Sequence, residues 1–167
     1  GRDVPPQCAG QYIDALENKI SEIGIGKIAS IGGRYFGMDR DKRWERVQVA
    51  YDAFTMGDDP KGSVKYLLAD SASEALEAAY SRAETDEFVT PTFIRGAKPV
   101  RDGDSIIMFN FRPDRAREIT RSFVDEELKD LKRSTIFKDL HYVTMTVYDA
   151  TIKNVHVAYP PRHIRNT

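Results

Sequence analysis

The sequence predicts an α/β domain built as three layers, α/β/α, around a mixed, largely parallel sheet. Three observations lead to this expectation. The chain has 167 residues, enough for one domain with a hydrophobic core. Short apolar runs alternate with longer segments whose apolar residues recur every three or four positions, a pattern typical of strands separated by helices. The two strongest strand segments, 27–31 and 104–111, each lead into an arginine-bearing turn and a helical pattern.

Hydrophobic spacing and turn residues give the order of the elements. Helices are predicted at 9–23, 40–54, 63–69, 71–84 and 113–131, and strands at 27–31, 88–94, 104–111, 141–148 and 155–159. Ser71 and Glu74 are close to a capping box for the fourth helix. Pro91 would place its strand at a sheet edge or a bulge.

The candidate core consists of the apolar faces of these helices. The residues expected to face inward are Tyr12, Ile13, Leu16, Ile20 and Ile23 in the first helix, Trp44, Val47, Tyr51 and Phe54 in the second, Ala75, Leu76, Ala79 and Tyr80 in the fourth, and Ala116, Ile119, Phe123 and Val124 in the fifth. The strand at 27–31 is expected to be buried on both faces.

A glycine-rich turn joins the strand at 27–31 to the second helix and carries two arginines. Asp39 is expected to cap a helix that begins near Arg40. Arg40 lies four residues before Trp44, which places it on the core-facing side of the first helical turn. Because helix N-termini at the carboxyl edge of a sheet favour anions, Arg34 and Arg40 are predicted to serve an anion site.

A second arginine-bearing turn follows the strand at 104–111. It reads Arg-Pro-Asp-Arg, and its proline and aspartate suit the first turn of a helix. Arg112 and Arg115 lie four residues before Ala116 and Ile119, so both are expected beside the core-facing side of the helix start. Buried arginines without enough carboxylates are costly. A bound phosphate or carboxylate would offset this by about 1.5–3 kcal/mol per charge-assisted hydrogen bond.

Simpler interpretations stay open for the same residues. Residues 112–115 could be a helix cap with salt bridges, and Arg40 could pair with Asp39 or Asp41. Arg2 and Asp3 could belong to a frayed terminus. The two arginine-bearing helix starts together are harder to explain in this way, which favours an anion site.

Composition argues against several classes of protein. The formal net charge of −1 argues against a nucleic-acid-binding module. No apolar run could span a membrane, no signal-peptide pattern is found, and Cys8 is alone, so a cytoplasmic protein is expected. His141, His156 and His163 lack partners at metal-ligand spacing, and no metal site is predicted.

Three segments read GRDVPP at 1–6, GRYFGMDRDKRWER at 33–46 and DSIIMFNFRPDRARE at 104–118. They resemble signatures of the cofactor-independent (2,3-bisphosphoglycerate-independent) phosphoglycerate mutases and occur in the expected order. That family pairs an alkaline-phosphatase-like domain with an inserted substrate-binding, or phosphotransferase, domain. The resemblance implies that residues 1–159 form the inserted domain without its first strand, and that residues 160–167 are a linker toward the absent phosphatase-like domain.

The resemblance also implies a chemistry. The family interconverts 3-phosphoglycerate and 2-phosphoglycerate in glycolysis through a phosphoserine, beside two manganese ions, in the phosphatase-like domain. By resemblance, Arg2 and Asp3 contact the glycerate, and Asp3 is the candidate catalytic acid/base for its hydroxyls. Arg34 and Arg40 would bind the carboxylate and phosphate end, and Arg112 and Arg115 would bind its charged groups and hold the phosphoryl group.

The family's serine nucleophile and metal ligands have no counterpart in this chain. The resemblance therefore predicts a chain that is inactive by itself, binds no cofactor, and belongs to a monomeric cytoplasmic enzyme. Its expected partners are phosphoglycerate and the phosphatase-like domain of the same polypeptide, with no nucleic acid and no membrane. The rival hypotheses are a non-catalytic anion-binding or regulatory module for a phosphorylated metabolite, and a structural domain whose arginines pair with carboxylates.

Overall fold

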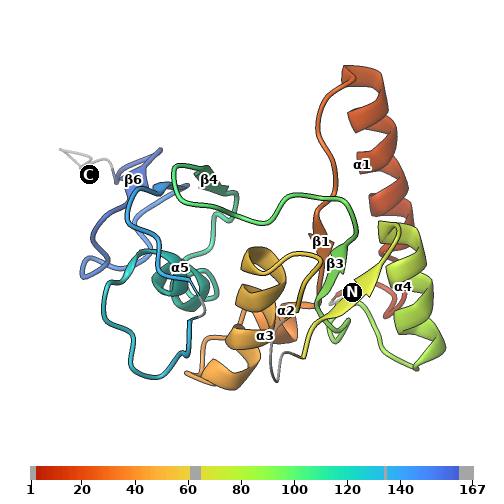
Figure 1. Cartoon of the computed structure of the whole chain (residues 1–167), viewed down its shortest axis with the longest axis horizontal. Helices are drawn as coiled ribbons and strands as arrows, with labels where there is room; N and C mark the ends of the chain where they lie inside the picture. Colours follow the sequence, from red (N-terminus) through yellow and green to blue (C-terminus); the bar gives the residue numbers. More distant parts are fainter. Residues whose placement is uncertain (1–2, 61–64, 134, 162–167) are drawn as a thin grey trace, which may run out of the picture.

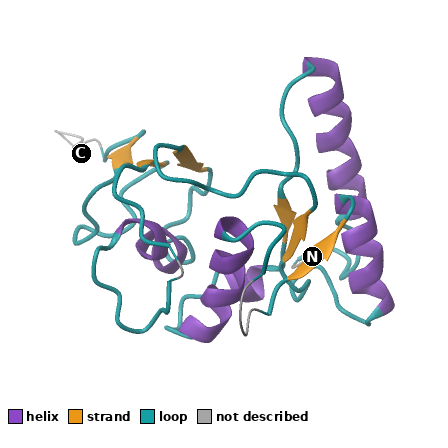
Figure 2. Cartoon of the chain, in the orientation of Figure 1, coloured by secondary structure: helices purple, strands orange, loops and turns teal. Residues whose placement is uncertain are grey.

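The computed structural model describes residues 3–60, 65–133 and 135–161 of the chain (Figure 1). In chain order the elements are α1 (Gly10–Ile23), β1 (Ser30–Ile31), α2 (Arg34–Gly37), α3 (Trp44–Thr55), β2 (Leu67–Ala69), α4 (Ala72–Ser81), β3 (Thr92–Ile94), β4 (Ser105–Met108), α5 (Arg117–Val124), β5 (His141–Thr144) and β6 (His156–Val157). The predicted α/β class is confirmed. Figure 2 shows how short the strands are and how much of the chain around the second sheet is loop.

The described strands form two three-stranded sheets where a single sheet was expected. The first has the order β1-β3-β2, with β1 antiparallel and β2 parallel to β3. The second has the order β4-β5-β6 and is parallel throughout. The prediction of mixed, largely parallel pairing is therefore confirmed, although the strands are divided between two halves of the molecule (Figure 1).

The first sheet is the middle of three layers. Neighbouring side chains of a strand point to opposite faces. Accordingly, Phe93 of β3 packs with Val49 of α3, whereas Ile94 packs with Ala72 of α4. Both β3 residues are buried. Helix α1 lies outside this unit and packs against α4.

The second sheet joins the first half of the molecule through a shared core. Tyr142 of β5 packs with Ile119 and Phe123 of α5, and these also pack with Val47 and Tyr51 of α3. The Tyr51 and Phe123 ring centroids are 5.0 Å apart. Since α3 follows the first arginine-bearing turn and α5 follows the second, this core holds the two turns side by side.

For helices away from the arginine-bearing turns, the observed boundaries agree with the prediction. For the helices that directly follow these turns, the boundaries differ from it. For α4, the Ser71 hydroxyl accepts the Glu74 N–H at 3.1 Å, which confirms the cap. In contrast, α3 begins at Trp44 rather than near residue 40, and α5 spans 117–124 rather than 113–131. The helix predicted at 63–69 is wrong, because residues 67–69 form β2; residues 63 and 64 lie outside the described residues.

The strands are shorter than predicted, and β1 is only partly buried. The expectation that Pro91 marks an edge strand or a bulge is wrong, because β3 is the central strand of its sheet. Pro91 directly precedes β3, so its missing N–H removes no hydrogen bond from the ladder. Its carbonyl accepts the Leu67 N–H at 2.9 Å.

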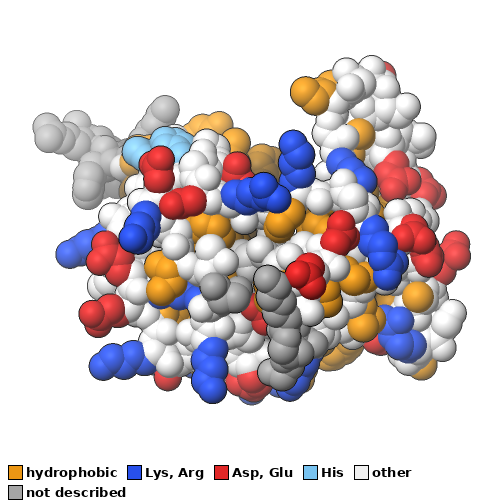
Figure 3. Space-filling model, in the orientation of Figure 1, with side chains coloured by type: hydrophobic (Ala, Val, Ile, Leu, Met, Phe, Trp, Pro, Cys, Tyr) orange, Lys and Arg blue, Asp and Glu red, His pale blue; other side chains and the backbone are white. Residues whose placement is uncertain are grey.

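The apolar stripes of α3, α4 and α5 are buried or partly buried, as predicted, whereas in the stripe of α1 Ile13 and Ile20 are partly buried and the other predicted residues are exposed. Tyr12, Leu16 and Ile23 are 61%, 51% and 61% exposed. Within the described residues, no helix is both long and apolar enough to cross a membrane. The face in Figure 3 mixes acidic and basic side chains, in keeping with the net charge near zero.

Candidate functional site

The first arginine-bearing turn is braced by the loop at 87–89. Gly33 donates its N–H to the Val89 carbonyl at 2.7 Å, and Tyr35 donates to the Glu87 carbonyl at 3.0 Å. A Cβ on Gly33 would overlap the Glu87 carbonyl group and lie 2.7 Å from the Val89 nitrogen. Only glycine permits this close approach. Next to it, the Arg34 Nε lies 3.4 Å from a Glu87 carboxylate oxygen.

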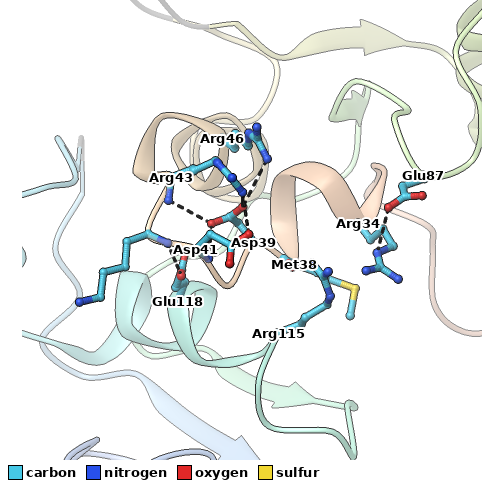
Figure 4. A network of polar contacts seen from close by, with 10 residues as sticks. Arg34, Met38, Asp39, Asp41, Arg43, Arg46, Glu87, Arg115 and Glu118 are labelled. Carbon is cyan, nitrogen blue, oxygen red and sulfur yellow. Dashed lines mark hydrogen bonds and ion pairs between the residues drawn. The ribbon is translucent and has the colours of Figure 1, made fainter.

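Asp39 organises the rest of this turn from a position that is only 3% exposed. Its Oδ2 accepts the N–H groups of Asp41 at 2.9 Å and Arg43 at 3.0 Å, and its Oδ1 lies 3.5 Å from Arg46 Nη1 (Figure 4). Burial alone would raise the pKa of Asp39, but the N–H groups of Arg43 and Asp41 outweigh it and the pKa lies below its ordinary value. Asp39 is therefore an ionised carboxylate that fixes the backbone of the turn.

The prediction that Asp39 caps a helix beginning near Arg40 is wrong. Arg43, not Asp39, is the residue at the N-cap of α3, and Arg40 lies on the irregular turn before the helix. The Arg40 side chain is 50% exposed, so the expectation that it faces the core is also wrong. Arg40 Nη1 pairs with Asp114 Oδ2 at 2.8 Å, across the gap between the two turns.

The second arginine-bearing turn, 112–116, is also irregular. Ala116 is fully buried and donates its N–H to the Pro113 carbonyl at 3.0 Å. The expectation that the proline and aspartate of this turn begin the helix is wrong, since α5 begins at Arg117. The arginines therefore project from a loop rather than from a helical turn.

The segment before this turn is held by one buried tyrosine. The Tyr148 hydroxyl is 2.9 Å from the Met108 carbonyl oxygen and 2.5 Å from the Asn110 carbonyl oxygen. Burial raises the pKa of Tyr148, so the phenol keeps its proton and can donate it to these carbonyls. The end of β4 and the start of the turn are thereby fixed.

Contacts among the described residues join the two turns directly. They are Arg40 Nη1 to Asp114 Oδ2 at 2.8 Å, Arg115 Nη1 to the Met38 carbonyl at 2.8 Å, and the Lys42 N–H to Glu118 Oε1 at 2.9 Å. The hydrogen bond from Arg40 lowers the pKa of Asp114, and the charge of Arg112 acts in the same direction. Arg112 is exposed. Arg40 and Arg115 are therefore held at Asp114 and Met38, and Arg112 lies exposed on the same turn as Asp114.

Arg34 borders the same region through its backbone, while its guanidinium group lies beside Glu87. Its carbonyl accepts the Met38 N–H at 3.0 Å, so Arg34 and Arg115 both border Met38 (Figure 4). Arg34 and Met38 line a cavity of about 280 Å³ together with Met108 of β4 and Ile119 of α5. The walls of this cavity thus come from both halves of the molecule.

The two candidate site residues at the N-terminus, Arg2 and Asp3, are not part of the two arginine-bearing turns. Arg2 lies outside the described residues. Asp3 is exposed and has a left-handed backbone, with φ of 64°. The chain after it runs along the loop between α4 and β3 whose residues 87–89 brace the first turn, because the Pro6 carbonyl accepts the Asp86 N–H at 2.9 Å. No hydrogen bond or ion pair among the described residues connects Asp3 with the four arginines.

Sequence reasoning found the arginines but missed the groups that support them. The Met38 carbonyl, Glu87 and Glu118 act through contacts between distant segments; Lys42 and Glu118, for example, are 76 residues apart. No local pattern marks these positions. The interpretation that the arginines pair with carboxylates does describe Arg34 and Arg40 as they lie in this structure.

Other chemistry-bearing groups are less organised. Nowhere in the described ranges do three or more His, Cys, Asp or Glu side chains come together in a way that could hold a metal ion. His141 and His156 stack with ring centroids 4.3 Å apart, and the free thiol of Cys8 lies 3.4 Å from Asp86 Oδ2. The arginine-bearing turns are therefore the candidate site.

Comparison with known families agrees with this choice. Residues 1–150 match the family described as BPG-independent PGAM N-terminus. The chain belongs to this family. Relatives named 2,3-bisphosphoglycerate-independent phosphoglycerate mutase include those of Clostridium botulinum (strain ATCC 19397 / Type A), at 50% identity, and Clostridium kluyveri, at 52% identity. Each match covers 100% of this chain and 32% of the relative.

A solved structure agrees on the fold. The crystal structure of Leishmania mexicana phosphoglycerate mutase at low cobalt concentration matches with a TM-score of 0.83 over 96% of this chain, at 32% identity. The match covers 30% of that protein. The family predicted from the three signatures is confirmed, and the chain spans about a third of the length of its relatives.

Proposed function

We propose that this chain is the substrate-binding part of a glycolytic phosphoglycerate mutase that interconverts 3-phosphoglycerate and 2-phosphoglycerate. The observation that carries the proposal is the contact between the two arginine-bearing turns. It gathers Arg40, Arg112 and Arg115 from segments about 74 residues apart in the chain. The family and the names of the relatives support the choice of reaction.

Arginine suits a substrate that carries both a phosphate and a carboxylate. A guanidinium group offers a planar fork of donors to such oxygens. Phosphoryl transfer depends mainly on positioning and on neutralising charge. Arg40 and Arg112 are exposed, so an arriving anion can reach them. At Arg40 the anion would replace the carboxylate of Asp114, and Arg115, anchored on the Met38 carbonyl, would add its positive charge beside the anion.

Within this site we assign the carboxylate and phosphate end to Arg34 and Arg40, and the transferring phosphoryl group to Arg112 and Arg115. Arg2 and Asp3 would contact the glycerate, with Asp3 as acid/base for its hydroxyls. The left-handed backbone of Asp3 supports a special role, because such conformations in residues other than glycine are often functional.

The remaining chemistry belongs to parts of the polypeptide that this chain does not contain. A phosphatase-like domain would carry the phosphoserine and two manganese ions, and residues 160–167, of which only 160 and 161 are described, would lead toward it. Residues 1–159 would be the substrate-binding domain. We place the enzyme in the cytoplasm as a monomer without nucleic-acid or membrane partners.

Arginine substitutions in the complete polypeptide test the proposal. Arg112→Ala and Arg40→Ala should each lower kcat/KM for phosphoglycerate by roughly 10²–10³-fold, because each removes a donor to the substrate's anionic groups. Arg95→Ala is the matched control: Arg95 is 51% exposed and pairs with Asp70 at 3.1 Å, away from the turns. Steady-state kinetics with circular dichroism as a check on folding provide the measurement.

The outcomes separate the hypotheses. Near-normal kinetics in Arg112→Ala and Arg40→Ala would remove these residues from the site. Phosphoglycerate binding without interconversion by the complete polypeptide would favour the non-catalytic module. The present chain alone should show no isotope exchange between the two phosphoglycerates, because the phosphate-accepting serine lies outside it.

A further inference from the structure

Two arginines of the candidate site are paired with carboxylates, but through different nitrogen atoms. Arg40 uses a terminal nitrogen, Nη1, which lies 2.8 Å from Asp114 Oδ2. Arg34 uses its inner nitrogen, Nε, which lies 3.4 Å from Glu87 Oε1 (Figure 4). The two terminal nitrogens of an arginine form a fork that can bind a phosphate or a carboxylate. Asp114 therefore occupies a nitrogen of this fork in Arg40, whereas Glu87 contacts Arg34 behind the fork.

The surroundings of Arg34 agree with this division. Its Nε is buried and makes no hydrogen bond with the described residues, so the carboxylate of Glu87 is the charge that compensates it there. The Arg34 side chain is 24% exposed, and its two terminal nitrogens make no hydrogen bond or ion pair within the described part of the chain. The fork of Arg34 is therefore available for an anion without the release of any protein contact.

The backbone of Glu87 is fixed to the turn that carries Arg34. The Glu87 carbonyl accepts the Tyr35 N–H at 3.0 Å, and the Val89 carbonyl accepts the Gly33 N–H at 2.7 Å. Gly33 and Tyr35 are the chain neighbours of Arg34. The backbone thus holds the Glu87 side chain beside Arg34, through hydrogen bonds that a substitution of either side chain leaves in place.

We propose that Glu87 is a positioning residue: its carboxylate holds Nε of Arg34 and directs the two terminal nitrogens toward the substrate. This rests on the proposed function, which assigns the carboxylate and phosphate end of phosphoglycerate to Arg34. An arginine side chain loses the freedom of several rotatable bonds when it binds a ligand. Because Glu87 orients the guanidinium group before the substrate arrives, less of this freedom remains to be lost on binding.

The negative charge of Glu87 has an opposite effect as well, since it repels an anionic substrate. The contact at Nε limits this repulsion, because it keeps the carboxylate away from the outer edge of the guanidinium group. If orientation outweighs repulsion, removal of the carboxylate weakens catalysis; if repulsion outweighs orientation, removal improves it. The sign of the effect therefore tests the proposal.

A double-mutant cycle in the complete polypeptide provides this test. Arg34→Ala should lower kcat/KM for phosphoglycerate by roughly 10²-fold, and Glu87→Ala by roughly tenfold. Because Glu87 acts through Arg34, the double variant should lie within about twofold of Arg34→Ala. Glu77→Ala removes a carboxylate from an exposed position of α4, and as the matched control it should leave kcat/KM unchanged.

Urea denaturation of the same proteins separates positioning from a purely structural ion pair. The single variants should fold, because the backbone hydrogen bonds of Gly33 and Tyr35 do not involve the exchanged side chains. Glu87→Gln, which keeps the size of the side chain, replaces Glu87→Ala in the cycle if the alanine variant does not fold. Unfolding midpoints that are not additive, together with additive effects on kcat/KM, would identify a structural pair and overturn the proposal.

The remaining outcomes distinguish this proposal from the proposed function. A normal or higher kcat/KM in Glu87→Ala would overturn the role of Glu87, while the substitutions of Arg40 and Arg112 would still test the function. Normal kinetics in Arg34→Ala would overturn it too, because no substrate-binding arginine would then be positioned. A complete wild-type polypeptide without mutase activity would overturn the proposed function itself, and the role of Glu87 with it.

Discussion

The two arginine-bearing turns are supported in different ways. The first, 33–43, is fixed by its own residues and by the loop beside it: Gly33 approaches the backbone at 87–89, and Asp39 accepts two N–H groups of the turn. The second, 112–116, has the Ala116 N–H bond within it and otherwise depends on its neighbours. Arg115 is anchored on the first turn, and Tyr148 holds the segment before it.

This difference indicates a hierarchy. The first turn is a platform, and the second is positioned on it through contacts between residues far apart in the chain. Damage to the first turn should therefore disturb both turns and the stability of the whole chain, whereas damage to the support of the second should stay local.

The largest expected effect comes from Gly33→Ala. The added methyl group would collide with backbone atoms of the 87–89 loop, which cannot rotate away. We expect a loss of about 3 kcal/mol in the free energy of unfolding. Urea denaturation followed by Trp44 fluorescence provides the measurement.

Gly37→Ala is the matched control, since Gly37 ends α2 and its Cβ would lie 3.5 Å from the side chain of Ala50 in α3, an ordinary contact. It should change stability by less than about 1 kcal/mol. Equal effects of the two substitutions would contradict the platform role of the first turn.

A smaller effect is expected from Tyr148→Phe. It leaves the carbonyl groups of Met108 and Asn110 without their shared donor and should cost about 1–2 kcal/mol. Amide hydrogen exchange should quicken around the second turn and stay unchanged at 33–43. Tyr12→Phe, at a tyrosine that is 61% exposed, should leave both regions unaffected. Faster exchange in both turns would argue against the hierarchy.

The sequence predicted structure well where a helix's own residues determine it. The Ser71 cap of α4 and the stripe of Val47 and Tyr51 in α3 are confirmed. The prediction for α1 failed for part of its stripe: its spacing is helical and Ile13 packs against the core beside α4, but Tyr12, Leu16 and Ile23 are exposed. Spacing determines which residues share a face and says nothing of what covers that face.

At the site, the sequence predicted which residue types matter but not the geometry that holds them. Asp39 and Asp114 suit helix starts by local rules, yet neither starts a helix in the structure. Asp39 binds the N–H groups of a turn, and Asp114 binds Arg40 across 74 residues. Glu118 was not recognised, because its role depends on a partner from another segment.

The central claim is that guanidinium groups from the two turns together bind a small phosphorylated acid. A crystal structure of the complete polypeptide with 3-phosphoglycerate tests it most directly. We expect Arg40, Arg112 and Arg115 within hydrogen-bond distance of the ligand's phosphate or carboxylate oxygens, with Arg40 released from Asp114. A ligand bound elsewhere, with Arg40 still paired to Asp114 and Arg112 directed into solvent, would contradict the account.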